Sequence, residues 1–116
     1  MDERLAKALE FSNLRHTLHL EKRRLQEKLK ADLTLSYNGG VFQIDRNFIV
    51  FLNLLTPDED ATSTVVLDDR QDPIYIENLQ EFKRKALNVY NRCINQYYVD
   101  FEALKKKRSV KAVVDL

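Results

Sequence analysis

The chain has 116 residues, the length of a single domain, with 44% hydrophobic and 32% charged residues. This composition is too apolar for a disordered chain and too charged for a membrane protein. With two glycines and two prolines in all, the chain lacks the turns of an all-β barrel and the glycine-rich loops of a phosphate-binding βαβ enzyme. We therefore expect a mainly helical protein.

Residues 2–37 fit one long helix, because good helix formers fill the gaps between apolar residues and no glycine or proline precedes Gly39. Asn38-Gly39-Gly40 then supplies a left-handed stop. An alternative makes Thr34–Tyr37 a strand and Asn38-Gly39 a hairpin turn. The sequence favours the helix because the apolar stripe continues. The stripe consists of Leu5, Leu9, Leu14, Leu18, Leu25, Leu29, Leu33 and Tyr37.

Residues 38–77 are predicted to form a small acidic α/β cap. Asp45 is a typical N-cap for a short, densely apolar helix. An acidic loop follows that helix, and a hairpin loop rich in aspartate joins two later strands. The predicted elements are a strand at Val41–Ile44, a helix from Asp45 to Leu55, strands at Thr64–Leu67 and Pro73–Ile76, and the loop Asp68–Asp72.

Residues 78–108 are predicted to form the last helix, and residues 109–116 a tail. Asn78-x-x-Glu81 resembles a capping box with Asn in place of Ser or Thr. Apolar residues follow at steps of three and four. Among them is Cys93, the only cysteine, which excludes an intramolecular disulfide and fits a reducing compartment, where we expect it to be buried.

The predicted fold is one α+β domain over residues 1–116, mainly α with a small β element. Two long antiparallel helices form a helical hairpin, and a short helix with a two- or three-stranded sheet caps its tip. Each apolar stripe is too narrow for a closed core, which predicts a homo-oligomer. The expected interhelical seam is Leu14, Leu18, Leu25, Leu29, Phe82, Ala86, Cys93, Tyr97, Phe101 and Leu104.

Charge is segregated along the chain. Residues 1–36 hold 8 Lys and Arg against 6 Asp and Glu (net +2), residues 37–77 hold 2 against 8 (net −6), and residues 78–116 hold 9 against 4 (net +5). This pattern favours two different partners, or it reflects the residue types that helices and turns prefer. Basic clusters spread along the helices are candidate phosphate contacts. They are Lys22, Arg23, Arg24, Lys83, Arg84, Lys85, Lys105, Lys106, Lys107 and Arg108.

No motif indicates catalysis. His16 and His19 are three residues apart, but no further ligand has metal-site spacing. The acidic loops lack the EF-hand pattern and are expected to be solubilising. We therefore expect no enzyme, no catalytic, metal or cofactor site, and no small-molecule substrate.

The opening Asp2–Asn13 resembles the start of small proteins of unassigned function from T-even-like tailed phages, especially marine ones. The stretches Val66–Ile74, Asn78–Phe82 and Lys105–Val110 are similar too. The resemblance covers most of the chain and implies a phage origin, with a role in virion assembly or in the infected cell. It carries no catalytic residues.

The sequence therefore predicts a non-enzymatic assembly protein that associates with itself and with another phage or host protein. The alternative is a nucleic-acid-binding accessory protein of phage replication, recombination or transcription. With no signal peptide at Met1–Arg4 and no membrane-length apolar run, we expect it in the cytoplasm of the infected cell or in the virion, without a membrane partner. Candidate partner-binding residues are Phe48, Phe51, Asp58, Glu59, Asp60 and Tyr98.

Overall fold

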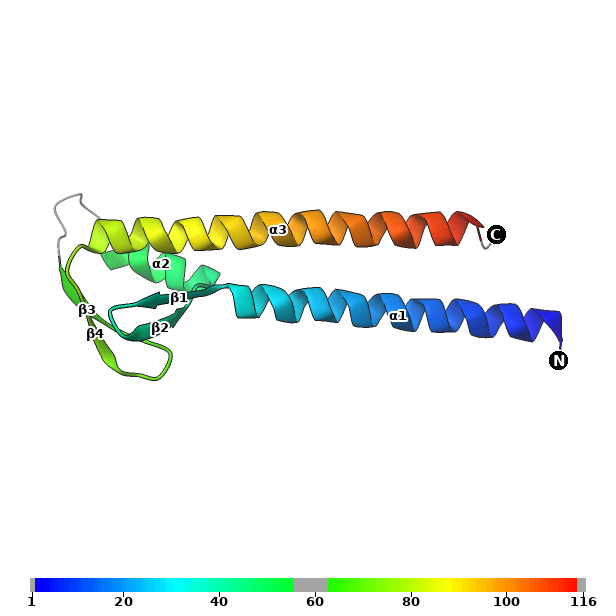
Figure 1. Cartoon of the computed structure of the whole chain (residues 1–116), viewed down its shortest axis with the longest axis horizontal. Coiled ribbons are helices and arrows are strands. Elements are labelled where there is room, and N and C mark those ends of the chain that lie inside the picture. The colour runs from blue at the N-terminus through cyan, green and yellow to red at the C-terminus, as the bar shows by residue number, and fades with distance from the viewer. Residues whose placement is uncertain (1, 56–62, 115–116) are drawn as a thin grey trace. The chain divides into compact units, whose positions relative to one another are not determined.

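The structure, a computed structural model, describes the backbone of residues 2–55 and 63–114 and the side chains of residues 2–55 and 63–107. Within these residues the chain is mostly helical, with two antiparallel two-stranded sheets (Figure 1). No helix in the described part is both long and apolar enough to cross a membrane. The elements are α1 (Glu3–Asp32), β1 (Thr34–Tyr37), β2 (Gly40–Gln43), α2 (Arg46–Leu55), β3 (Thr64–Leu67), β4 (Pro73–Ile76) and α3 (Leu79–Val114).

The chain forms two compact units, which we name by their content. The helix pair consists of Met1–Lys28 and Gln96–Leu116, and the core unit of Leu29–Asn95. Both α1 and α3 contribute residues to each unit, whereas α2 and all four strands belong to the core unit.

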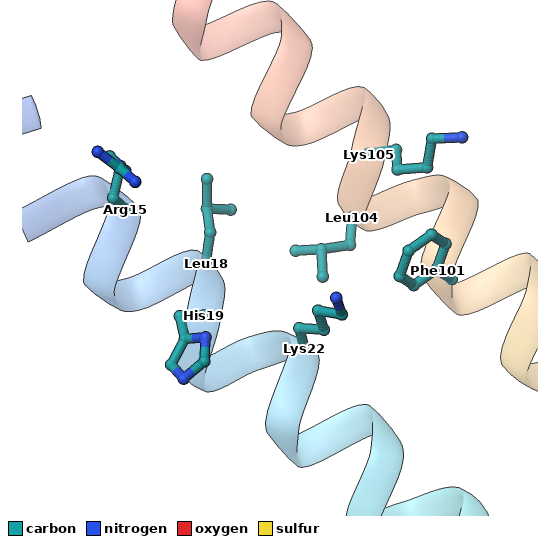
Figure 2. Close-up of a pocket in the computed structure, with 7 residues that line it drawn as sticks. All are labelled: Arg15, Leu18, His19, Lys22, Phe101, Leu104 and Lys105. Carbon is teal, nitrogen blue, oxygen red and sulfur yellow. The ribbon is translucent and has the colours of Figure 1, made fainter.

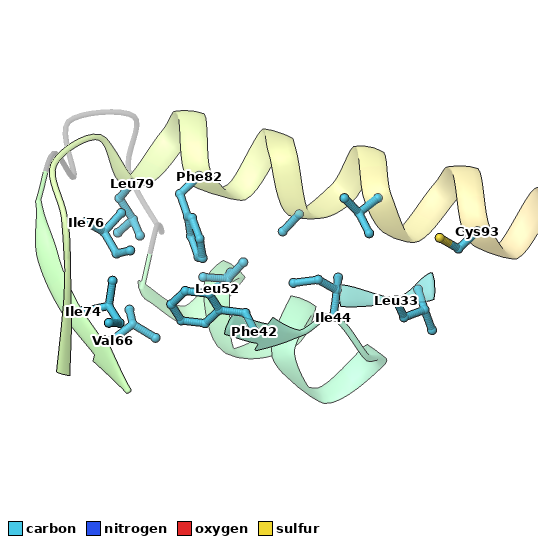
Figure 3. Close-up of a cluster of buried hydrophobic side chains, with 12 residues drawn as sticks. Leu33, Phe42, Ile44, Leu52, Val66, Ile74, Ile76, Leu79, Phe82 and Cys93 are labelled. Atoms are coloured by element: carbon cyan, nitrogen blue, oxygen red, sulfur yellow. The ribbon is translucent and has the colours of Figure 1, made fainter. Parts of the chain in front are cut away.

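The core unit holds all the buried apolar side chains of the described residues. Phe82 of α3 is their centre: its ring centroid lies 5.0 Å from that of Tyr37, 5.1 Å from Phe42 and 6.1 Å from Phe48. The rings meet edge to face, an arrangement that adds to the free energy of apolar burial. The full set is Leu33, Phe42, Ile44, Leu52, Val66, Ile74, Ile76, Leu79, Phe82, Ala86, Val89 and Cys93 (Figure 3).

Residues 34–37 are a strand, which corrects the prediction of a helix from residue 2 to residue 37. The helix ends at Asp32, and β1 pairs with β2 so that Tyr37 faces Gly40. Asn38 and Gly39 both have positive φ, 48° and 84°, as a two-residue type I′ hairpin turn requires. The turn chemistry decides the outcome, because Leu35 and Tyr37 still reach the core as alternate residues of a strand.

The predicted capping residues are confirmed at the two later helices. Phe48 N–H donates to Asp45 Oδ1 over 2.8 Å, and Glu81 N–H donates to Asn78 Oδ1 over 3.0 Å. The strands β3 and β4 have the predicted bounds. The last helix, however, continues to Val114 rather than ending at residue 108, because no glycine or proline interrupts it.

Asp68 joins the two hairpins of the core unit. It is the one buried charged residue among those described, and its carboxylate accepts backbone N–H groups from Val41, Arg70 and Asp72 at 2.9 to 3.2 Å. Asp69 Oδ1 accepts the N–H of Gln43 over 2.9 Å. The two aspartates therefore satisfy the outer edge of β2, where a strand would otherwise be needed.

The pKa of Asp68 is lowered. Burial raises it, but hydrogen bonds from the backbone of Asp72, Val41 and Arg70 and the charge of Arg70 outweigh burial. Sequence reasoning placed Asp68 and Asp69 in a solubilising loop, and the structure instead makes them ties between β2 and the β3–β4 turn.

We predict that Phe82→Ala lowers the free energy of unfolding by about 3–5 kcal/mol, because it leaves a cavity beneath three other rings. Phe51→Ala is the matched control. Its side chain also lies on a helix but is 41% exposed, so the loss is expected to be below about 1 kcal/mol. Urea unfolding followed by circular dichroism measures both. Equal losses for the two variants would contradict the central place of Phe82.

We also predict that stability falls as the pH drops through the acid range, partly through Asp68. Its folded pKa is depressed, so its contribution is present above the ordinary carboxyl pKa and is lost as the pH falls through the folded value. Asp68→Asn has one acceptor oxygen instead of two, and should lower the urea midpoint at pH 7 while flattening its decline toward pH 3. Asp72→Asn is the control. An Asp68→Asn profile parallel to that of the unmodified protein would refute this role.

Candidate functional site

The helix pair contains no buried side chain in the part that the structure describes. All ten predicted seam residues are buried or partly buried, but those of the helix pair, Leu14, Leu18, Leu25, Tyr97, Phe101 and Leu104, are only partly buried. Leu5 and Leu9 of the predicted stripe are 53% and 46% exposed. The step of five residues from Leu9 to Leu14 turns the helix by about 140° beyond a full turn, so the earlier leucines leave the seam.

Two ion pairs join the helices of the pair on one side. Glu21 Oε1 lies 3.5 Å from Lys107 Nζ, and Lys28 Nζ lies 3.5 Å from Asp100 Oδ2. These residues, with Arg24, line a groove of about 430 Å³. Its charges largely neutralise one another, and partly exposed pairs of this kind each contribute no more than about 1 kcal/mol. They fix an antiparallel register, since higher numbers in α1 match lower numbers in α3.

A second groove in the helix pair is lined by basic side chains, with no acidic residue in its lining. Its volume is about 240 Å³, and Arg15, His19, Lys22 and Lys105 surround it. Its apolar surface comes from Leu18, Phe101 and Leu104. Figure 2 shows Leu18 and Lys22 of α1 pointing across the groove toward Leu104 and Phe101 of α3. We call this set of seven residues the basic groove.

The aromatic ring of the basic groove is in contact with two of its cations. Lys22 Nζ lies 5.9 Å from the centroid of Phe101, and Lys105 Nζ lies 6.0 Å from it. Lys105 is also 3.3 Å from Glu102. Arg15 stacks over Phe11 at 5.9 Å, and neither Arg15 nor Lys22 has an acidic partner among the described residues. The groove therefore holds positive charge that the protein itself does not neutralise.

The structure brings together two of the three basic clusters, which corrects the expectation that they are spread along the helices. One lysine from each of two clusters, Lys22 and Lys105, enters the basic groove. Arg23 instead pairs with Glu27 at 3.6 Å, while Arg24 and Lys107 line the other groove. Lys106 is exposed and lines neither groove.

The third cluster belongs to the core unit. Its Lys85 pairs with Glu81 at 3.4 Å and lies 5.5 Å from the ring centroid of Tyr37. Lys83 is partly buried and Arg84 is exposed. The side chain of Arg108 lies outside the described residues.

The predicted partner-binding residues belong to both units, and three of them lie in a part of the chain that the structure does not describe. Phe48 is partly buried and packs against the core, and its contact with a partner stays a prediction. Phe51 of the core unit is exposed, and Tyr98 of the helix pair is 63% exposed. Asp58, Glu59 and Asp60 lie outside the described residues.

Sequence reasoning missed several exposed apolar residues, and it did not assign Arg15 and His19 to the basic groove. The spacing of Arg15, Leu18 or His19, and Lys22 at three, four and seven residues places them on one side of α1, and this signal was available. Leu20, 46% exposed, and the outer face of the β3–β4 hairpin were also missed. That face consists of Val65, Leu67 and Tyr75, each more than half exposed.

Candidate metal ligands and the single cysteine were compared with their surroundings among the described side chains. No three His, Cys, Asp or Glu side chains among them come close enough to hold a metal ion. Cys93 is buried, as predicted, and its Sγ lies 3.3 Å from the carbonyl oxygen of Asp32 at the end of α1. A thiol in this position satisfies a helix-terminal carbonyl.

Comparison with known proteins found no match for this chain. No family model matches the chain, and neither the curated proteins nor the solved structures include a similar one. The functional argument therefore rests on the residues of the helix pair and the core unit alone.

Proposed function

We propose that this chain is a non-enzymatic assembly protein that associates with a second copy of itself through the helix pair. One observation carries the proposal: no described side chain of the helix pair is buried, while the core unit holds all the buried apolar side chains. Two helices packed only against each other keep much of their apolar surface in water, and helices in water depend on tertiary packing for their stability.

The apolar surface in question is a row on α1 that faces away from the seam. Leu9 and Leu20 are eleven residues apart, close to three full turns, so they share one side of the helix. Leu5 lies one turn before Leu9. These three leucines, which we call the outer row, are 46% to 53% exposed. Covering the exposed half of each contributes roughly 1 kcal/mol, since full burial of a leucine contributes about 1.5–3 kcal/mol.

A second copy of α1 fits the outer row. When two such helices pack antiparallel, Leu9 of one copy lies opposite Leu20 of its partner, and the reverse contact forms at the same time. This arrangement is isologous, the commonest symmetry in homo-oligomers, and it covers both leucines of both copies. At its beginning α1 also extends past the last described turn of α3 (Figure 1), and Leu5 and Leu9 of α1 are both exposed.

The setting is part of the proposal. The resemblance to phage proteins supports a scaffold or adaptor role that brings a phage or host protein to the assembled form. We also propose that the chain forms the helical hairpin with a β cap that the sequence predicts. The antiparallel ion pairs within the helix pair support this arrangement.

The proposal predicts an oligomer that resists salt and depends on the outer row. Light scattering coupled to size exclusion should give at least twice the chain mass of 13.7 kDa at about 100 µM protein, at low and at high salt. The double variant Leu9→Glu with Leu20→Glu should elute as a single chain, because each buried carboxylate would lack a partner.

The matched control is Thr17→Glu with Gln26→Glu. It adds the same charge to exposed positions of α1 outside the outer row and should keep the mass of the unmodified protein. A single-chain mass for the unmodified protein, or an oligomer retained by the outer-row variant, would refute self-association through this surface.

A further inference from the structure

We infer that the basic groove of the helix pair is a binding site for single-stranded nucleic acid. In this assignment Arg15, Lys22 and Lys105 contact the phosphates, and the ring of Phe101 takes the face of a base. The inference goes beyond self-association, because the outer row of α1 and the basic groove have no residue in common.

Charge is divided between the two sides of the helix pair. Glu21 and Asp100 both lie on the side of the interhelical ion pairs, where they neutralise Lys107 and Lys28. The basic groove has four basic residues in its lining and no carboxylate. Glu102 meets only one of them, Lys105. The groove therefore favours an anionic ligand, and Lys and Arg bind the phosphates of a nucleic acid with an affinity that falls steeply with salt.

An apolar surface lies between the basic side chains of the groove. A duplex that is bound through its phosphates alone would make no favourable contact with Leu18, Phe101 and Leu104, because apolar side chains do not bind phosphate oxygens. The unstacked bases of a single strand can stack on an aromatic ring, and proteins that bind single strands combine basic grooves with such rings. Phe101 is partly exposed within the groove, so part of its ring is open to a ligand that displaces the lysines beside it.

A second ring extends this surface along α3. Tyr98 and Lys105 are seven residues apart, about two turns, so they lie on the same side of the helix. The Tyr98 side chain is 63% exposed. A strand that follows the groove past Phe101 therefore meets a further exposed aromatic residue on which a base can stack.

The size of the basic groove also favours a polymeric ligand. The groove has a volume of about 240 Å³. Pockets for whole drug-sized ligands usually have about 300–1,000 Å³. The basic groove is therefore smaller than a site for a whole drug-sized ligand, and it suits one unit of a longer chain whose neighbouring phosphates continue onto the surrounding surface.

Fluorescence anisotropy with a labelled dT15 oligonucleotide tests the inference at 50 mM salt. The double variant Lys22→Ala with Lys105→Ala should bind at least about tenfold more weakly, and the slope of log affinity against log salt should fall by about 1.4, for two lost single-strand contacts. The matched control is Arg23→Ala with Lys106→Ala. It removes the same charge one residue further along each helix, at positions that do not line the basic groove. It should change the affinity less than about threefold.

A second pair of variants tests the ring. Phe101→Leu keeps the apolar packing but removes the stacking surface, and should weaken dT15 binding at least about fivefold. Phe101→Tyr keeps the ring and should bind as the unmodified protein does. A duplex of the same length should bind more weakly than dT15 and should not respond to Phe101→Leu. Circular dichroism of each variant verifies that it remains helical.

Three results would overturn the inference: no binding of dT15 by the unmodified protein, equal effects of the groove variant and its control, or a Phe101→Leu variant that binds dT15 normally. Failure here is distinct from failure of self-association, because the mass of the unmodified protein is measured without nucleic acid.

Discussion

The structure depends on the burial of apolar side chains in the core unit, away from water. Every buried apolar side chain among the described residues belongs to the core unit, and Phe82 contacts three further rings there. Asp68 completes this unit by tying β2 to the β3–β4 turn through backbone hydrogen bonds. The same two long helices continue into the helix pair, where no described side chain is buried. The core unit therefore has its own source of stability, whereas in the proposed function the helix pair gains stability from a second copy of the chain.

The helix pair offers three different surfaces for contact. Ion pairs neutralise one side of the helix pair. On another side the basic groove holds Arg15 and Lys22 without an acidic partner among the described residues, and the outer row of leucines lies on α1 away from α3. Each surface is suited to a different neighbour, because apolar rows favour burial against protein and acid-free basic grooves favour polyanions. An assembly protein that also holds nucleic acid would use the last two surfaces at the same time.

Local signals in the sequence predicted much of the core unit but little of the site. The capping residues Asp45 and Asn78 act over three residues, and the loop between β3 and β4 is closed by its own aspartates, so short-range chemistry decides both. At residues 34–37 two local signals competed, and the Asn38-Gly39 turn outweighed the helical stripe. The meeting of Lys22 with Lys105 depends on the register between two helices distant in sequence, which periodicity within either helix does not specify.

Amide hydrogen exchange followed by mass spectrometry at two protein concentrations is the most direct test of this division. Exchange reports local opening, and opening that self-association suppresses depends on concentration. The account predicts that peptides from the core unit are protected equally at about 1 µM and about 100 µM, whereas peptides covering Leu5 to Leu20 gain protection only at the higher concentration. Strong protection of those α1 peptides at the lower concentration, or no gain at the higher one, would contradict it.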